Sequence, residues 1–187
     1  MGDKLKNYFE DFLKKQPLFL NKKVLQANYS PDRISYRDEQ INWVASALAP
    51  ALRLEKPSNI FLYGKPGTGK TLVTHHVTKQ ILEVANKNNL PISVIYINCK
   101  LKRVADTEYR LIVQLASEFG KNIPATGLPT DEVYKIFIKS IDEEKKLILL
   151  VLDEIDQLVK KAGDEILYNL TRLNSELKNV EIAFIGI

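Results

Sequence analysis

The 187 residues of the chain are 45% hydrophobic, enough for one substantial core, and no apolar run is long enough to cross a bilayer. The formal net charge of +4 permits nucleic-acid binding without demanding it. A single cysteine excludes an internal disulfide, and the N-terminus is too charged for a signal peptide, so we expect a cytoplasmic protein.

The first predicted element is a basic amphipathic helix that ends before Pro17. Its apolar residues recur at the spacing of one helix face: Leu5, Tyr8, Phe9, Phe12 and Leu13. Such a helix can contact a membrane or a partner, but docking onto its own domain is the commoner outcome. We therefore expect an N-terminal amphipathic arm over residues 1–23, docked on the domain that follows it, and no membrane partner.

A second helix is predicted after Ser35-Tyr36-Arg37-Asp38, which has the form of a capping box. From there strand and helix patterns alternate, which predicts a parallel sheet with helices on both faces. The strands are expected at 59–63, 92–97, 147–152 and 182–187. The further helices are expected after residue 70 and near 107–119, 131–141 and 164–177.

A complete G-x-x-x-x-G-K-[ST] phosphate loop lies between the first predicted strand and the helix after it. Its glycines let successive backbone N–H groups turn inward around a phosphate. Lys70 can reach the outer phosphates, Thr71 offers a hydroxyl to Mg²⁺, and the positive end of the helix points at the same place. The sequence therefore predicts an ATP or ADP site with Mg²⁺ on Gly64, Lys65, Pro66, Gly67, Thr68, Gly69, Lys70, Thr71 and Leu72.

Two acids, Asp153 and Glu154, follow the apolar run at 147–152. The carboxyl ends of parallel strands are where ligands bind in open α/β sheets. Asp153 is expected to hold Mg²⁺, partly through water, and Glu154 to orient and deprotonate the water that attacks the γ-phosphate. By themselves the two acids would be read as solvated loop residues, but the phosphate loop upstream favours the catalytic interpretation.

The connection between the strands at 92–97 and 147–152 is longer than a single crossover helix requires. We therefore expect an inserted helical segment over about residues 100–145. Between its two helical patterns, Gly127-Leu128-Pro129 marks a rigid turn, and Thr130 can cap the next helix. A plain connector between two helices is an equally good interpretation of this turn.

These residues resemble the archaeal origin-recognition and helicase-loading initiators of the AAA+ ATPase superfamily. The phosphate loop and the two acids occur in many AAA+ proteins. Other segments narrow the resemblance to initiators: Tyr29-Ser30-Pro31-Asp32 with Arg37, Asn98-Cys99, Gly127-Leu128-Pro129, and Ile166-Leu167-Tyr168 through Arg172. The likeness covers nearly the whole chain from about Val24 onward.

The resemblance implies a three-layer P-loop AAA+ core over residues 24–187, with strand order 5-1-4-3-2 and cut before the fifth strand and the helical lid. It implies an adenine pocket made by Val24, Leu25, Tyr29 and Pro31, with Arg37 nearby. It also implies that the inserted segment contacts DNA, at Lys121, Gly127, Leu128 and Pro129.

The function implied is that of a DNA replication initiator that binds origin DNA, mainly through a winged-helix domain absent from this sequence, and helps to load the replicative helicase. Other initiator subunits are further candidate partners. ATP hydrolysis would act as a switch, and because the family's assisting arginines would follow Ile187, we expect little or no turnover from this chain. The alternative is a clamp-loader-like or signalling AAA+ ATPase without direct DNA contact, or a nucleotide-binding module that never hydrolyses ATP.

Overall fold

A computed structural model of the chain describes residues 2–19, 21–25, 31, 34–100, 107–124 and 126–187. The chain divides into two compact units, Met1–Arg33 and Ile34–Ile187. The first unit contains helix α1 (Gly2–Lys14), as predicted, and a 3₁₀ helix (Lys22–Leu25). The docking of α1 and the boundary expected at residue 23 stay predictions. Among the described residues, no helix is both long and apolar enough to cross a membrane.

The second unit is built on a four-stranded parallel sheet with the order β1-β4-β3-β2. The strands are β1 (Ile60–Phe61), β2 (Ile92–Asn98), β3 (Lys146–Asp153) and β4 (Val180–Gly186). Every residue of β3 after Lys146 is buried, as expected for a central parallel strand covered on both faces. The parallel α/β sheet is thus confirmed, and β1 lies at its edge, as the implied strand order requires.

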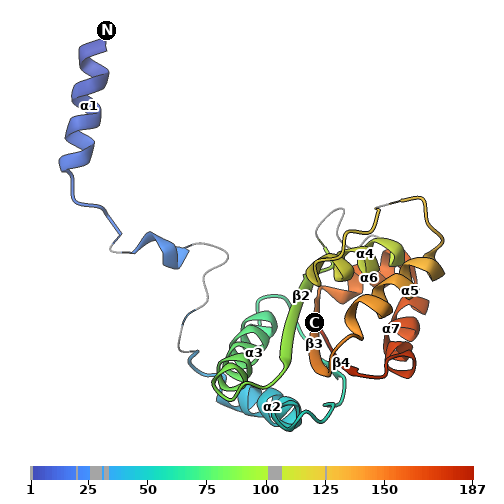
Figure 1. Cartoon of the computed structure of the whole chain (residues 1–187). Coiled ribbons are helices and arrows are strands. Elements are labelled where there is room, and N and C mark those ends of the chain that lie inside the picture. Colours follow the sequence, from blue (N-terminus) through green and yellow to red (C-terminus); the bar gives the residue numbers. More distant parts are fainter. Residues whose placement is uncertain (1, 20, 26–30, 32–33, 101–106, 125) are drawn as a thin grey trace. The chain divides into compact units, whose positions relative to one another are not determined.

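Helices cover both faces of the sheet and make three layers (Figure 1). One face carries α2 (Asp38–Leu48), a 3₁₀ helix (Ala49–Arg53) and α3 (Lys70–Lys87). The other carries α4 (Glu108–Glu118), α5 (Thr130–Ile141), α6 (Ile155–Ala162) and α7 (Glu165–Glu176). The helices expected near 107–119, 131–141 and 164–177 are confirmed, and α6 is an additional helix that starts directly after the two acids.

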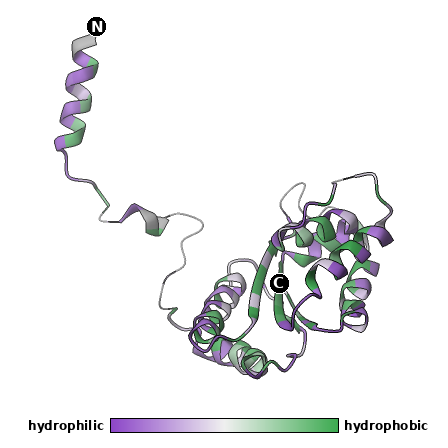
Figure 2. Ribbon diagram, in the orientation of Figure 1, coloured by the Kyte–Doolittle hydropathy of each residue, from purple (hydrophilic) through white to green (hydrophobic). Residues whose placement is uncertain are grey.

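The core consists of two apolar clusters separated by the sheet. Alternate residues of β3 point to opposite faces, so Leu149 belongs to the cluster under α2 and α3 while Leu150 belongs to the cluster under α4 to α7. Figure 2 shows the strands as predominantly hydrophobic and the outer helix faces as mixed. This double cover holds the carboxyl ends of β2, β3 and β4 in a fixed relation.

The first strand is shorter than predicted. Only Ile60 and Phe61 pair with β4, because Leu62 donates its N–H to Gly186 and the chain then leaves the sheet. The strand expected at 59–63 is therefore confirmed only for Ile60 and Phe61. Phe61 is 61% exposed and Tyr63 is 86% exposed, and none of the described strands pairs with the outer edge of β1.

Both predicted helix caps were wrong. Tyr36 adopts a left-handed backbone conformation (φ 60°), so the helix that a Ser35 cap would start is interrupted, and α2 begins after Arg37 without a side-chain cap. At α5 the extended Pro129 occupies the cap position, which places Thr130 inside the helix. The backbone carbonyl of Pro129 accepts the N–H groups of Glu132 and Val133 instead.

Candidate nucleotide-binding site

The phosphate loop connects β1 to α3 and is shaped by glycines at positions that need a left-handed backbone. Gly67 has φ 77°, and Gly69, the last residue before α3, has φ 86°. A side chain at Gly67 would meet no atom within 4 Å, so this turn of the loop is not packed against other parts of the protein and needs glycine for its left-handed backbone alone. Such a cradle, at the N-terminus of an 18-residue helix, suits a phosphate group.

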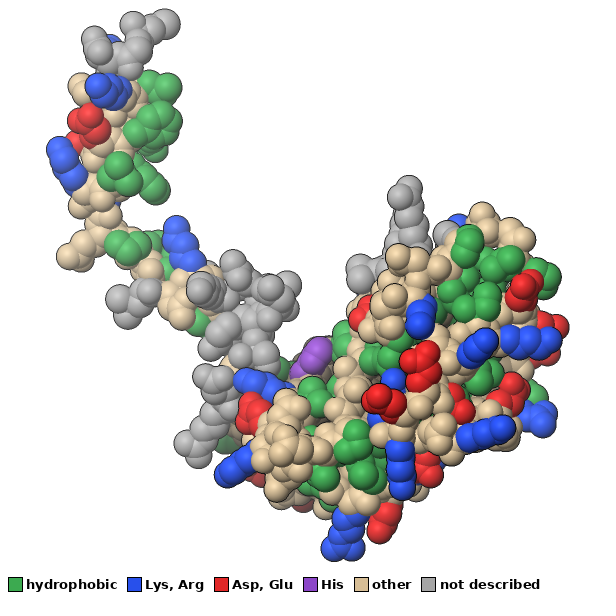
Figure 3. All heavy atoms as spheres, viewed as in Figure 1, with side chains coloured by type: hydrophobic (Ala, Val, Ile, Leu, Met, Phe, Trp, Pro, Cys, Tyr) green, Lys and Arg blue, Asp and Glu red, His purple; other side chains and the backbone are tan. Residues whose placement is uncertain are grey.

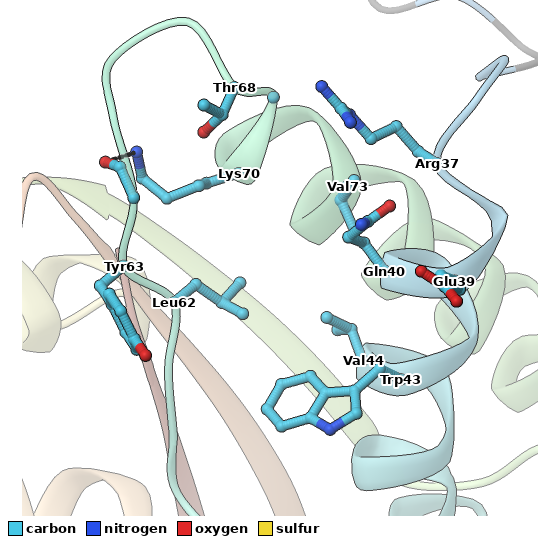
Figure 4. A pocket seen from close by; sticks show the side chains of 12 residues that line it. Arg37, Glu39, Gln40, Trp43, Val44, Leu62, Tyr63, Thr68, Lys70 and Val73 are labelled. Carbon is cyan, nitrogen blue, oxygen red and sulfur yellow. Dashed lines mark hydrogen bonds between the residues drawn. The ribbon is translucent and has the colours of Figure 1, made fainter.

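Lys70, the first residue of α3, is held over this loop. Its Nζ donates to the backbone oxygens of Gly64 at 2.8 Å and Lys65 at 3.2 Å, the former along the dashed line in Figure 4. The Thr68 hydroxyl donates to the Lys65 oxygen at 2.9 Å and closes the loop from within. The loop therefore presents a positive charge beside the cradle before any ligand is counted.

The buried acid meets the loop through Thr71. The Thr71 hydroxyl lies 3.2 Å from both carboxylate oxygens of Asp153, although the two residues are 82 positions apart in the sequence. Asp153 is only 5% exposed and also accepts the N–H of Glu154 at 3.0 Å. A hydroxyl and a carboxylate side by side are the hard oxygen donors that Mg²⁺ prefers.

These two donors alone do not complete a metal site. In the described part of the chain, no three His, Cys, Asp or Glu side chains gather in a way that could hold a metal ion. Mg²⁺ is commonly held by one or two protein oxygens together with the phosphates of a substrate. Thr71 and Asp153 therefore fit a Mg²⁺ ion that arrives with a nucleotide.

Tyr96, which sequence reasoning missed, also contacts Asp153. It lies on β2, and its hydroxyl donates to Oδ2 of Asp153. Burial and the neighbouring Asp153 carboxylate together raise the pKa of Tyr96 well above its ordinary value, so the hydroxyl keeps its proton and remains a donor. In the sequence, Tyr96 is one of two hydroxyl-bearing residues in the strand predicted at 92–97, with Ser93 the other, so nothing there marked it as a site residue.

Glu154 stands at the junction of β3 and α6 in a left-handed conformation, with φ 54°. Such a backbone is uncommon for a residue with a side chain and costs on the order of 1–3 kcal/mol, so it is retained only where the surrounding structure imposes it. The Glu154 carboxylate pairs with Lys100, which lies just beyond β2, with Nζ 3.2 Å from Oε2 and 3.4 Å from Oε1. Lys100 is a second site residue that sequence reasoning missed.

Two cavities flank the loop. One of about 650 Å³ lies between α2 and the segment after β1, as Figure 4 shows. Besides residues of the loop and α3, it is lined by Arg37, Glu39, Gln40, Trp43, Val44, Leu62 and Tyr63. The other, of about 530 Å³, contains the acids Asp153 and Glu154, together with Lys100 and Thr71. Lys70 borders both cavities, so a ligand seated in the loop can extend to either side.

The adenine residues implied by the resemblance are only partly visible. Arg37 lines the larger cavity, with its Nε 3.8 Å from where a side chain on Gly69 would begin. Tyr29 lies outside the described residues, and Val24, Leu25 and Pro31 belong to the first unit, which is described by itself. Their contact with adenine stays a prediction. Trp43, on α2 of the second unit, also lines this cavity and was not among the residues expected there.

The residues expected to contact DNA lie outside both cavities. Lys121 faces Glu143 at 3.8 Å, Leu128 packs against the core cluster under α4 and α5, and Gly127 and Pro129 are exposed. On the face shown in Figure 3, basic and acidic side chains of the described residues are intermixed. Contact between this segment and DNA stays a prediction.

Known proteins resemble the chain over nearly its whole length. A family model for an AAA domain matches residues 53–187. The ORC1-type DNA replication protein of Pyrococcus horikoshii is 46% identical over 187 residues, which cover 98% of this chain and 44% of that protein. The ORC1-type DNA replication protein 1 of Methanosarcina acetivorans is 46% identical over 183 residues, which cover 98% and 43%.

Among solved structures, the Aeropyrum pernix ORC1 protein in complex with DNA matches with a TM-score of 0.78 and 39% identity, covering 88% of this chain and 41% of that one. The chain thus spans less than half the length of these relatives.

Proposed function

Because this chain belongs to the AAA domain family, we propose that it binds ATP and ADP together with Mg²⁺. We propose further that it is the nucleotide-binding part of a DNA replication initiator, in which ATP hydrolysis acts as a switch. The ORC1-type names of the relatives support the second proposal, since 98% of this chain aligns with them.

One observation carries the nucleotide proposal: the Thr71 hydroxyl lies 3.2 Å from the Asp153 carboxylate, directly beside the glycine cradle and Lys70. A glycine-rich turn without a ligand has no need for a buried acid at this point. A carboxylate and a hydroxyl beside a phosphate loop instead provide the oxygen ligands that Mg²⁺ prefers. The contact between loop and acid therefore favours a site for a phosphate group and a divalent ion.

Glu154 is the proposed general base. Its side chain lines the same cavity as Lys70 and Thr71, where it can orient a water molecule and accept its proton as the water attacks the γ-phosphate. Lys70 offsets the charge on the outer phosphates. Thr71 and Asp153 would hold Mg²⁺, which when bound neutralises phosphate oxygens. Little turnover by this chain alone, as the resemblance implies, stays a prediction.

Nucleotide binding can be tested on the unaltered chain by thermal unfolding and by the fluorescence of Trp43, the chain's single tryptophan, which lines the larger cavity. At a ligand concentration a hundred times the Kd, linkage contributes about 2.7 kcal/mol, which raises Tm by several degrees. MgATP and MgADP should raise Tm and change the emission, whereas adenosine, which lacks phosphates, should do so far less. If millimolar MgADP changes neither signal, the nucleotide proposal is wrong.

DNA binding is the proposal that separates an initiator from the rival AAA+ functions. The solved Aeropyrum pernix ORC1 protein is in complex with DNA and is 39% identical to this chain, which favours DNA as a partner. The proposed contact segment offers the exposed Gly127 and only scattered lysines, one of which, Lys121, already faces Glu143. Contacts to phosphates position a protein without reading sequence, so we expect weak, sequence-tolerant binding by this chain.

Fluorescence anisotropy with duplexes of different sequence, at two salt concentrations, tests this proposal. Binding should weaken strongly as salt rises, because counterions are released when phosphates are contacted. Lys121→Ala should weaken binding to all sequences alike, and Lys87→Ala, at the far end of α3, serves as a control. Absence of any binding would mean that this chain does not itself contact DNA, as in the clamp-loader-like or signalling alternative. Origin DNA, the replicative helicase and other initiator subunits are the proposed partners, in the cytoplasm.

A further inference from the structure

Tyr96 links the buried acid of the site to the helix that follows the phosphate loop. Its hydroxyl donates to Oδ2 of Asp153, and its ring stacks on His75 of α3 with the ring centroids 4.2 Å apart. Neither Tyr96 nor His75 has a part in the chemistry proposed above.

Contacts connect Tyr96 and His75 to Asp153 and Thr71 in a closed ring of four residues. Thr71 and His75 are four residues apart on α3, so they lie on one face of the helix. Thr71 contacts the Asp153 carboxylate at 3.2 Å, and His75 contacts Tyr96, which returns to the same carboxylate. Neither Asp153 nor Tyr96 can rotate without breaking a contact with another element, so the orientation of the carboxylate is fixed from two sides.

The hydrogen bonds that the Asp153 carboxylate accepts also determine which lone-pair sites on its oxygens remain free to bind a metal ion. Oδ1 accepts the N–H of Glu154 at 3.0 Å, Oδ2 accepts the hydroxyl of Tyr96, and Thr71 lies within reach of both oxygens. A carboxylate offers about four lone-pair sites, so room remains for one further partner. Without Tyr96 the carboxylate could turn, and the free position would move away from Thr71.

On the premise that the site binds nucleotide with Mg²⁺, we propose that Tyr96 is a positioning residue that orients the Asp153 carboxylate toward the divalent ion. Groups that hydrogen-bond to metal-binding side chains commonly change metal affinity by roughly 10- to 100-fold when removed. Tyr96 should therefore act on the Mg²⁺-dependent part of nucleotide binding and leave the part carried by the loop and Lys70 unchanged.

The test is Tyr96→Phe, which keeps the ring and its stacking on His75 and removes only the hydroxyl. ADP affinity is measured by Trp43 fluorescence in EDTA and at increasing Mg²⁺. The EDTA value should match that of the unaltered chain, while the Mg²⁺ concentration for half-maximal effect should rise roughly 10-fold. Tyr134→Phe is the matched control, because Tyr134 donates to the Glu108 carboxylate at 2.6 Å and neither residue lines the two cavities beside the loop.

A second variant keeps the test decisive if Tyr96→Phe unfolds at a lower temperature than Tyr134→Phe. His75→Ala leaves the Tyr96 hydroxyl in place but removes the ring against which Tyr96 is held, and His75 is exposed, so its loss should not unfold the chain. The Mg²⁺ dependence should shift in the same direction as in Tyr96→Phe, by a smaller factor.

The outcomes separate the two proposals. If the unaltered chain binds no nucleotide, the site itself is wrong, and the role of Tyr96 with it. If the unaltered chain shows Mg²⁺-dependent binding and Tyr96→Phe shows the same dependence, the positioning role is overturned while the nucleotide site stands. An equal loss of affinity with and without Mg²⁺ also overturns it, because Tyr96 would then act through packing alone.

Discussion

The two halves of the candidate site are supported in opposite ways. The loop half, residues 64–69 with Lys70, rises from a two-residue strand at the edge of the sheet, next to the exposed Phe61 and Tyr63. The acid half, Asp153 and Glu154, rises from the eight-residue β3, which has a neighbour on each side and helices over both faces. The loop half is therefore built from a short stretch of chain beside exposed side chains, whereas the position of the acid half depends on the packing of the whole core.

The difference follows from the kind of group that each half presents, which is backbone N–H groups in the loop half and a buried carboxylate in the acid half. A phosphate cradle uses backbone N–H groups, which glycines and a helix N-terminus orient with little help from the core. A buried carboxylate needs partners from other elements, and Asp153 has Thr71 from α3 and Tyr96 from β2. We therefore expect the loop half to tolerate surface changes and the acid half to respond to any loss of packing.

The largest expected contrast concerns the burial of the acid half. Cys99 is fully buried just after β2. Its backbone N–H donates a hydrogen bond to the backbone oxygen of Asp153 at 2.8 Å. Burial, followed by the charge of Asp153, raises the pKa of the Cys99 thiol from 9.0 to about 12. At tenfold per pKa unit, the reactive thiolate is roughly a thousandfold rarer than in a free cysteine.

Iodoacetamide at pH 8 should therefore label the folded chain far more slowly than the chain in urea. Cys99 is the only cysteine, so all labelling measured by mass reports this position. Since the neutral thiol is favoured by folding, its contribution to stability is complete below pH 9 and is lost as the pH rises from about 9 to 12. Rapid labelling of the folded chain would show that the acid half is open and would remove the contrast.

A second contrast compares a central strand with the edge strand. Leu150 on β3 is buried between Ile95 and Phe184 of the neighbouring strands, so Leu150→Ala should lower the free energy of unfolding by about 2–5 kcal/mol. Phe61→Ala on the exposed edge should cost roughly 1 kcal/mol or less. Urea unfolding of both variants measures the difference, and equal losses would mean that β1 is as much a part of the core as β3.

A third prediction separates binding from stability within the loop half. Lys70→Ala removes a charged donor, and a hydrogen bond to a charged group contributes about 1.5–3 kcal/mol, so nucleotide affinity should fall roughly 10- to 100-fold. The Tm without nucleotide should hardly change, since the hydrogen bonds that the Lys70 ammonium makes within the described residues go to carbonyls of its own loop. Calorimetric titration with MgADP measures the loss, and Lys87→Ala at the other end of α3 is the control. A comparable fall in both variants would contradict the assigned role.

The smallest expected effect is the loss of thermal stability when the Lys100–Glu154 ion pair is broken. Both side chains are more than one-third exposed, so the pair should contribute no more than about 1 kcal/mol to stability. Lys100→Ala should therefore lower Tm no more than Lys160→Ala, which breaks the similarly exposed pair with Asp156. Thermal unfolding of the two variants at low and high salt measures this comparison. A clearly larger loss for Lys100→Ala would mean that this contact supports the left-handed backbone at Glu154.

Most of the secondary structure could be predicted because its signals are local. The strands expected at 92–97 and 147–152 and the helix expected after residue 70 are confirmed as β2, β3 and α3. The predicted caps at Ser35 and Thr130 were wrong, because a left-handed Tyr36 and an extended Pro129 moved each helix start. Backbone conformation at a single residue depends on how the chain meets its neighbours, which a four-residue pattern does not contain.

The sequence by itself determined the phosphate loop and the two acids at the end of a buried strand, because glycine spacing and an uninterrupted apolar run have few other physical interpretations. Only the tertiary structure decided which side chains complete the site. Tyr96 reaches Asp153, and Lys100 reaches Glu154, because β2 pairs in register with β3, with Tyr96 opposite Val151 and Asn98 opposite Asp153. A hydrogen bond across strands that are more than fifty residues apart depends on that register, and no local pattern in either strand specifies it.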